Sequence, residues 1–190
     1  MPSRCKNPNS PAPDDAGWLH YVEPYAGGLS VLLANNPEGI SEVVNDLNLD
    51  LINFWRVLQD ELLFAIFERQ LQAFPFSETE FEESGFLDEE VIHRDGIDFA
   101  VAFFVRCRQS LAGRMKDFAS ITRNRTRRGM NEQVSAWLNA IEGLPAVHAR
   151  LKRVLILNQD ALEVIRKEDG PRTLFYLDPS YVASTRTSPD

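Results

Sequence analysis

Short apolar segments with the length of β-strands alternate along this chain with segments that have the period of α-helices. Strand candidates cover His20–Glu23, Ser41–Asn45, Val154–Leu157 and Thr173–Leu177. A chain that alternates strands with helices generally forms a parallel sheet whose faces the helices cover. The sequence therefore predicts an α/β fold with a parallel sheet.

The domain organisation is predicted from where the strand candidates stop. Residues 1–18 are rich in proline and polar residues and are expected to form a mobile tail. Residues 61–150 contain no confident strand candidate, so we expect a mostly helical insertion there. The flanking segments 19–60 and 151–190 would form the core, and a length of 190 residues suits one domain with a modest insertion.

Two helices are predicted within the middle of the chain. The first has apolar residues spaced four, three, four and four positions apart, at Leu51, Trp55, Leu58, Leu62 and Ile66. The second begins at Asn131, a residue type suited to an N-cap, and ends at residues 143–145, which read Gly-Leu-Pro.

Charge is unevenly distributed along the chain. Twenty Lys and Arg residues against 28 Asp and Glu residues give a net charge of −8, which excludes a partner attracted by overall positive charge. Residues 77–98 carry a net charge of −8, whereas residues 106–128 carry +7. The second segment is a local basic region that is able to bind an acidic partner.

The sequence shows no sign of export or membrane insertion. The apolar run Phe99–Val105 is far shorter than the roughly 20 residues that a membrane span needs, and the first 20 residues hold no apolar stretch. Cys5 and Cys107 have neither the spacing of a disulfide framework nor that of metal ligands. We therefore expect a cytoplasmic protein with no membrane partner and no metal.

Ligands of parallel sheets bind beyond the carboxyl ends of the strands, so the residues after each strand are candidates for a site. The first strand leads into a turn with paired glycines, which allow a ligand to approach the backbone closely. This turn lacks the G-x-G-x-x-G pattern of dinucleotide-binding loops, and ordinary turn chemistry is an alternative interpretation. Its residues are Glu23, Pro24, Tyr25, Ala26, Gly27 and Gly28.

Carboxylates follow the second and third strands. Asp46 can accept hydrogen bonds from both hydroxyls of a ribose, and Asp160 can accept one from an adenine amino group. Each is also suited to capping the helix that follows it. The residues alone leave both interpretations open.

The fourth strand leads directly into Asp178, Pro179, Ser180 and Tyr181. A helix cap accounts only for the acid. Pro179 has a fixed φ and no N–H, so the carbonyls around it can serve as acceptors, and Tyr181 offers a flat aromatic surface. Together these properties suit a flat ring that bears an amino group.

In their order along the chain and in their amino-acid sequence, the four segments resemble the motifs of the D12-class adenine-specific DNA N6-methyltransferases. Residues 21–28 resemble the family's E-P-F-x-G-x-G cofactor loop with Tyr25 in place of phenylalanine, and residues 45–53 resemble its N-D-x-N-x-D-L-x-N segment. Residues 158–161 fall where the family has its adenine-contacting acid. Residues 178–181 occupy the position of the family's Asp-Pro-Pro-Tyr catalytic motif, and Asp178 is its first residue.

The resemblance covers about residues 18–186. It implies a partial Rossmann-like sheet that binds S-adenosylmethionine, with a helical insertion that recognises double-stranded DNA. The cofactor would be bound by residues 23–28, Asp46 and Asp160. Catalysis would be carried out by residues 178–181. The Asp178 carboxylate and the Pro179 carbonyl would accept hydrogen bonds from the adenine amino group, and Tyr181 would stack on a base turned out of the duplex.

The basic segment supplies candidate DNA contacts. Arg123, Arg125, Arg127 and Arg128 lie among Thr and Asn side chains that suit phosphates and base edges. Pairing of these arginines with the acidic stretch 78–90 is the alternative interpretation.

The chain departs from the family pattern at three places. Ser180 replaces the second proline, an F/W-x-G-G-K cofactor motif is missing from the first residues, and the sequence stops nine residues after Tyr181. An enzyme without these parts could be a catalytically inactive remnant that binds DNA or cofactor, which is the alternative to an active methyltransferase. A complementing polypeptide that completes the sheet is a further expectation.

Overall fold

The computed structural model describes residues 17–85, 96–119 and 124–179. The chain divides into two compact units: unit 1 combines residues 1–47 with residues 154–190, and unit 2 comprises residues 48–153. The predicted core segments therefore extend into unit 2 by residues 48–60 and 151–153. The functional division into a catalytic core and an insertion stays a prediction.

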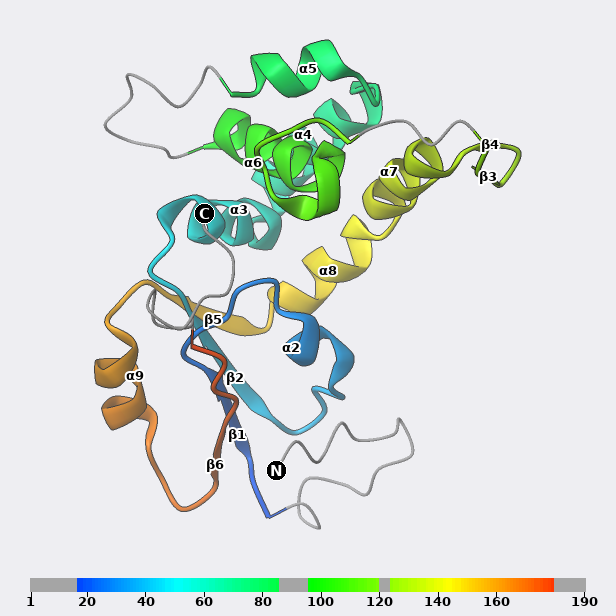
Figure 1. Ribbon diagram of the computed structural model, residues 1–190. Helices are drawn as coiled ribbons and strands as arrows, with labels where there is room; N and C mark the ends of the chain where they lie inside the picture. Colours follow the sequence, from blue (N-terminus) through cyan, green and yellow to red (C-terminus); the bar gives the residue numbers. More distant parts are fainter. Residues whose placement is uncertain (1–16, 86–95, 120–123, 180–190) are drawn as a thin grey trace. The chain divides into compact units, whose positions relative to one another are not determined.

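The sheet of unit 1 has four parallel strands in the order β5-β2-β1-β6 (Figure 1). They are β1 (His20–Glu23), β2 (Ser41–Asn45), β5 (Val154–Leu157) and β6 (Thr173–Phe175). All four predicted strands and their parallel pairing are confirmed. The fourth strand ends at Phe175, two residues earlier than the sequence predicted.

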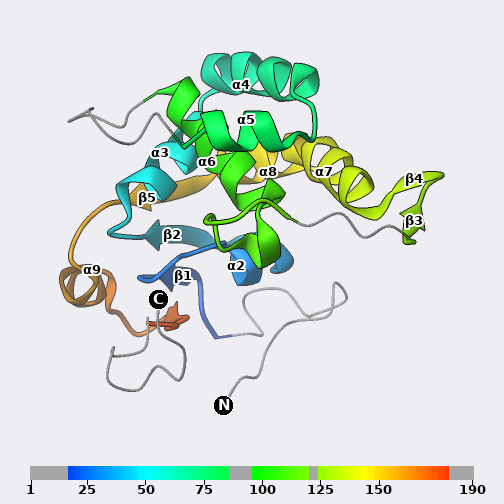
Figure 2. The ribbon, with the colours of Figure 1, turned by 45° about the horizontal axis from the view of Figure 1, so that its top comes forward.

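Both sides of this sheet carry a helix of unit 1, as Figures 1 and 2 show. On one side, Val164 of α9 (Ala161–Glu168) packs against Val22 and Val43 of the two central strands. All three valines are nearly inaccessible to solvent, and burial of each aliphatic side chain contributes roughly 1.5–3 kcal/mol. The short helix α2 (Ser30–Ala34) lies on the opposite side.

Unit 2 consists mainly of helices packed around aromatic side chains. Phe54 and Phe67 contact each other at a ring-centroid distance of 5.9 Å, and Phe104 lies 5.5 Å from Trp137. None of the helices in the described ranges has the length and apolar character of a membrane span. The helices are α3 (Leu49–Gln59), α4 (Glu61–Ala73), α5 (Glu78–Glu83), α6 (Ile97–Gln109), α7 (Glu132–Glu142) and α8 (Leu144–Leu151).

The single helix predicted through residues 51–66 is wrong, because the chain breaks at Asp60. This residue has an extended backbone, with φ −77° and ψ 130°, and its carboxylate accepts the N–H groups of Leu62 and Leu63 at 2.9 Å. Asp60 therefore ends α3 and caps α4. Leu62 and Ile66 are 77% and 50% exposed rather than part of one buried stripe.

The helix predicted after Asn131 is confirmed. The Asn131 side chain accepts a hydrogen bond from the N–H of Gln133 at 2.9 Å, and the helix ends at Glu142, directly before Gly143. Immediately before α7, the strands β3 (Thr126–Arg127) and β4 (Met130–Asn131) form a short antiparallel hairpin. The sequence analysis did not predict this hairpin.

Candidate active site at the carboxyl edge of the sheet

All four motif segments leave the sheet of unit 1 at the same edge, because its strands are parallel and in register. Val22 pairs with Val43 on one side and with Phe175 on the other. Just beyond β6, the N–H of Tyr176 donates to the carbonyl of Val22 at 2.9 Å. The segments that begin with Pro24 and with Tyr176 therefore start side by side.

Asn45, the last residue of β2, connects three of these segments. Its side chain is fully buried. Its Nδ2 donates to the carbonyls of Pro24 and Gln159, both at 3.0 Å, and its Oδ1 accepts the N–H of Gln159 at 2.8 Å. In addition, its backbone carbonyl accepts the N–H of Ala26 at 2.9 Å. Asn45 therefore fixes the glycine turn and the segment after β5 to the end of β2.

The sequence analysis did not single out Asn45 as a site residue. The available signal was an amide side chain at the end of a strand whose preceding residues, Val43 and Val44, are apolar. A buried amide of this kind generally has its hydrogen bonds satisfied within the protein. That rule indicates a positioning role but does not identify the partners.

Asp46 binds the glycine turn directly. Its Oδ2 accepts the N–H of Gly27 at 3.0 Å, and its carbonyl accepts Nδ2 of Asn158 at 2.7 Å. The cap of α3 is Asn48, whose side chain accepts the N–H of Leu51, so Asp46 does not serve as the helix cap that the sequence left open. Its role toward a ribose stays a prediction.

The glycine turn borders open space. Gly27 has a φ of +48°, a conformation that favours glycine. A methyl group built on Gly27 or on Gly28 would meet no heavy atom of the described residues within 4 Å. The backbone on this side of the turn is therefore accessible to a ligand.

Asp160 caps α9, as one of the two open interpretations expected. Its Oδ1 accepts the N–H groups of Leu162 and Glu163 at 3.0 and 3.1 Å. Within the described part of the chain, Oδ2 of this carboxylate has no hydrogen bond. The cap therefore leaves one oxygen with which Asp160 can accept a ligand amino group.

Glu23 lies behind the glycine turn and is only 1% exposed. The hydroxyl of Tyr21 donates to its Oε1 at 2.5 Å. Burial raises the pKa of the Glu23 carboxyl, while the hydrogen bonds from Tyr21 and from the backbone of Leu32 act against that rise. The side chain of Glu23 is therefore buried and hydrogen-bonded within the protein. Its contact with a cofactor stays a prediction.

The other members of the first motif are less exposed than its glycines. Pro24 and Ala26 are buried and Tyr25 is half-buried. These three residues therefore shape the turn mainly through their backbone and packing.

The predicted catalytic residues follow β6 at the same edge. Asp178 and Pro179 are exposed and come after Tyr176 and Leu177, which are 36% and 53% exposed. Ser180 and Tyr181 of the same motif lie outside the described residues.

Of the predicted DNA-binding arginines, Arg127 and Arg128 lie in the hairpin of unit 2 and Arg125 directly precedes it. Thr126 pairs with Asn131 and Arg127 with Met130, which leaves Arg128 and Gly129 as the connecting residues. Both have positive φ values, 54° and 73°, and this combination is typical of a type I′ turn. Arg123 lies outside the described residues.

The arginines of the hairpin differ in their contacts. Both terminal nitrogens of Arg128 donate to the carboxylate of Glu142, at 3.1 and 3.2 Å, and Nη1 also donates to Asn139. Arg125 lies 3.9 Å from Glu132, with its side chain 75% exposed. For Arg127, the described residues provide no ion pair.

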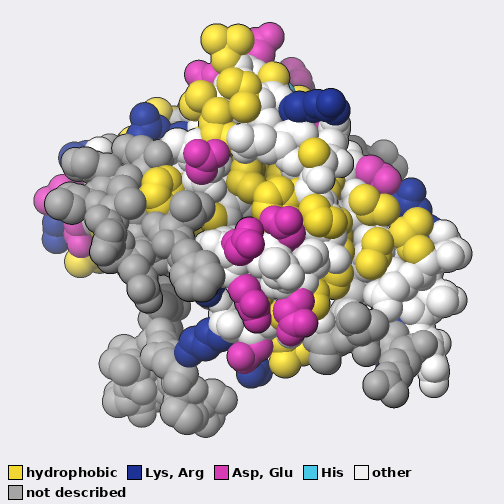
Figure 3. Space-filling view, turned by 90° about the horizontal axis from the view of Figure 1, so that it is seen from above, with side chains coloured by type: hydrophobic (Ala, Val, Ile, Leu, Met, Phe, Trp, Pro, Cys, Tyr) yellow, Lys and Arg dark blue, Asp and Glu magenta, His cyan; other side chains and the backbone are white. Residues whose placement is uncertain are grey.

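Acidic side chains gather on the face seen from above in Figure 3, and α5 alone carries four glutamates. Among the described residues, the ion pairs of the hairpin arginines are made with α7 and not with α5. The alternative of pairing with the stretch 78–90 therefore has no support in that part of the chain.

A parallel sheet with a glycine turn after β1 and polar segments after β2, β5 and β6 is typical of α/β proteins that bind a ligand at the carboxyl edge. The chain belongs to the D12 class N6 adenine-specific DNA methyltransferase family, whose model matches residues 12–189. The reaction of this family is methylation of N6 of adenine in DNA. A comparison with curated proteins gave no match.

Proposed function

We propose that the chain transfers a methyl group from S-adenosylmethionine to N6 of adenine in double-stranded DNA at the carboxyl edge of the unit 1 sheet. In this proposal the sheet is the Rossmann-like core and unit 2 contains the helical target-recognition insertion. The observation that carries the proposal is the register of β1 with β6, which brings the glycine turn and the Asp178-Pro179 segment to one edge.

The chemistry of the edge fits S-adenosylmethionine. The open space beside Gly27 and Gly28 would admit the cofactor next to the backbone. Asp46 would accept the ribose hydroxyls, and Oδ2 of Asp160 would accept the adenine amino group of the cofactor. When bound, S-adenosylmethionine supplies a methyl group on a positively charged sulfur, which is already activated for transfer.

Asp178 and Pro179 would prepare the acceptor. The lone pair of the adenine N6 is delocalised into the ring, so the amino group is a weak nucleophile. The carboxylate of Asp178 and the carbonyl of Pro179 would accept hydrogen bonds from its two hydrogens and orient the nitrogen toward the methyl donor. One of these two protons would leave the nitrogen as the methyl group is transferred from the sulfur. Tyr181 would stack on the everted base, with Ser180 as the connecting residue of the turn.

The basic hairpin would bind the DNA backbone. Arg125 and Arg127 are exposed cations of a kind that contacts phosphates, and Arg123 precedes them in the sequence. Arg128, because it is bound to Glu142, would act chiefly by holding the hairpin on α7. A metal-free reaction, a cytoplasmic location and a complementing polypeptide stay predictions.

Two substitutions test the proposal by separating chemistry from cofactor binding. We expect Asp178→Ala to abolish methyl transfer to duplex DNA while the calorimetric affinity for S-adenosylmethionine stays near that of the wild type. We expect Asp46→Ala to weaken cofactor affinity. Asp169→Ala is a matched control, since Asp169 is an exposed acid of unit 1 outside the four motifs.

Equal methylation by Asp178→Ala and the wild type would contradict the catalytic assignment. Unchanged cofactor affinity in Asp46→Ala would contradict the cofactor assignment. Wild-type protein that binds cofactor or DNA but transfers no methyl group would support the inactive-remnant interpretation instead.

A further inference from the structure

Residues 110–119, which we call the 110–119 loop, form a closed loop directly after α6 in unit 2. Ser110 and Phe118 form an antiparallel bridge, and the N–H of Leu111 donates to the carbonyl of Asp117 at 2.8 Å. The N–H of Ala119 donates to the carbonyl of Gln109 at 2.8 Å. The two ends of the loop are therefore joined, and its tip is held at a short distance from α6.

The base of this loop is anchored in the interior of unit 2. Gln109 is fully buried. Its Nε2 donates to the carbonyl of Pro75 at 2.9 Å, and its Oε1 accepts the N–H of Ser77 at 3.1 Å. Gln109, which accepts the hydrogen bond from Ala119 at the end of the loop, is thus fixed to the connection between α4 and α5.

The tip of the loop has an unfavourable backbone conformation. Ala112, Gly113 and Met115 have φ values of 54°, 71° and 61°. For Ala112 and Met115, which carry a Cβ, this left-handed region costs free energy. Such conformations persist only where surrounding contacts impose them, and they are frequent at functional sites.

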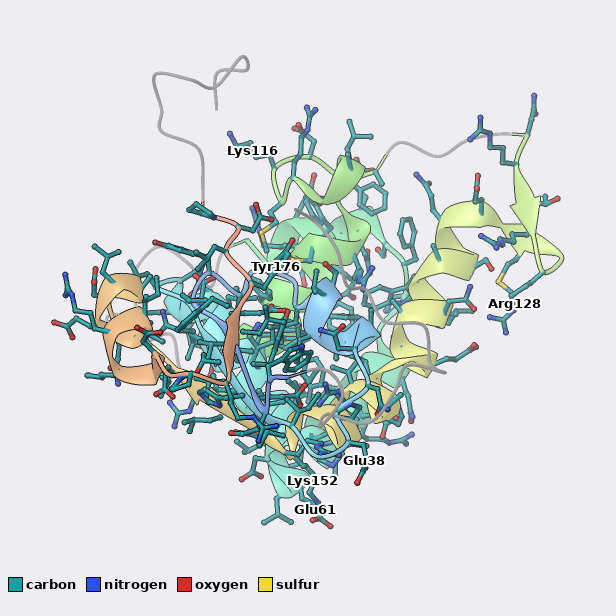
Figure 4. All side chains as sticks on the ribbon, turned by 90° about the horizontal axis from the view of Figure 1, so that it is seen from below. Glu38, Glu61, Lys116, Arg128, Lys152 and Tyr176 are labelled. Atoms are coloured by element: carbon teal, nitrogen blue, oxygen red, sulfur yellow. The ribbon has the colours of Figure 1, made fainter. Side chains whose placement is uncertain are left out.

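The contacts that impose the conformation are centred on Met115. Its N–H donates to Oγ of Ser110 at 2.9 Å, and its carbonyl accepts Nη2 of Arg106 at 2.5 Å. The two neighbours of this fixed residue, Arg114 and Lys116, are both exposed. Figure 4 shows the side chain of Lys116 directed away from the ribbon.

The two cations at the tip have no acidic partner within the described residues. Asp117 is the only acidic residue of the 110–119 loop, and it forms no ion pair in that part of the chain. The loop thus holds two positive charges on either side of a fixed backbone position and leaves both accessible to an external anion.

We propose that the 110–119 loop is a second contact to the DNA backbone, separate from the hairpin, in which Arg114 and Lys116 each neutralise a phosphate. This inference rests on DNA as the substrate. Two adjacent cations on a constrained loop can meet neighbouring phosphates without first losing the conformational freedom of a mobile segment. The contact is to the backbone, so we expect it to add affinity and not sequence preference.

The test is the salt dependence of affinity for duplex DNA without a target adenine, measured without cofactor. Each phosphate contact contributes about 0.9 to the slope of log affinity against log salt concentration. We therefore expect the double variant Arg114→Ala/Lys116→Ala to lower that slope by about 1.8. Arg114→Lys/Lys116→Arg keeps both charges and is expected to keep the slope.

Two further variants make the outcome specific. Arg69→Ala removes an exposed cation of α4 and is expected to leave the slope unchanged. Ser110→Ala keeps every charge but removes the acceptor of the Met115 N–H, so we expect lower affinity with an unchanged slope. An unchanged slope in Arg114→Ala/Lys116→Ala, with thermal stability equal to the wild type, would overturn the proposal.

The hairpin is tested in the same titration. If Arg125→Ala/Arg127→Ala lowers the slope and Arg114→Ala/Lys116→Ala does not, the loop proposal is overturned and the hairpin contact is supported. The reverse result would support the loop and contradict the hairpin assignment. A purely structural loop would show a lowered melting temperature without a change of slope, which also overturns the proposal.

Discussion

Glu23 is a carboxyl group held out of water behind the glycine turn. Burial raises its pKa above the usual value for a glutamate, despite the hydrogen bond from Tyr21. For an acid with a raised pKa in the folded state, the stabilising contribution is present below the unfolded pKa and is lost as the pH rises through the folded pKa. Glu23 therefore makes the fold less stable at neutral pH than in mild acid.

A Glu23→Gln variant should remove this dependence, because glutamine does not ionise. We expect the free energy of unfolding of Glu23→Gln, relative to the wild type, to rise between pH 4 and pH 7. Urea denaturation at the two pH values measures it, and Glu163→Gln, an exposed residue of α9, is the control. A relative stability that falls over this interval would show that Glu23 is stabilised as the carboxylate.

Single residues also mark the limit of sequence-based prediction at the site. Asp46 and Asp160 each had two open roles. The structure shows a cap for Asp160 and a contact with the glycine turn for Asp46. Asp160 accepts N–H groups of the turn that follows it, whereas the partner of Asp46 is Gly27, which lies in another segment. Both residues have the same capping propensity, so propensity alone could not distinguish the two cases.

At the scale of elements, strands were easier to predict than helix boundaries. The four strands of unit 1 are short apolar segments that end in polar motifs, and both signals are local. The break between α3 and α4 was missed because apolar spacing continues across Asp60, and a helical period does not reveal where a cap interrupts it. The β3–β4 hairpin was missed because its strands have only two residues each.

The hairpin's attachment to α7 leads to a prediction for Arg128. The side chains of Arg128 and Glu142 are 45% and 57% exposed, so their ion pair contributes only about 0.2–1 kcal/mol. We expect Arg128→Ala to weaken DNA binding by no more than about fivefold without a change in the salt slope. The same titration as for the loop measures it, with Arg125→Ala as comparison.

A slope that falls by about 0.9 in Arg128→Ala would mean that this arginine contacts a phosphate itself. That result would support the DNA-binding role predicted from the sequence over the positioning role proposed from the structure.

At the scale of the molecule, the order of motifs along the chain was the most informative part of the sequence. Four segments in family order predicted a shared site, and the parallel sheet brings the segments after β1, β2, β5 and β6 to one edge. The division between units near residues 47 and 153 could not be located from composition, because it depends on which helices pack together.

The central claim is that this edge transfers a methyl group to adenine. Duplex DNA is incubated with the purified chain and methyl-labelled S-adenosylmethionine, digested to nucleosides and separated by chromatography. We predict that the label appears in the N6-methyldeoxyadenosine of the DNA and disappears with Asp178→Ala. Label in a methylated cytosine, or no label although the cofactor binds, would contradict the account.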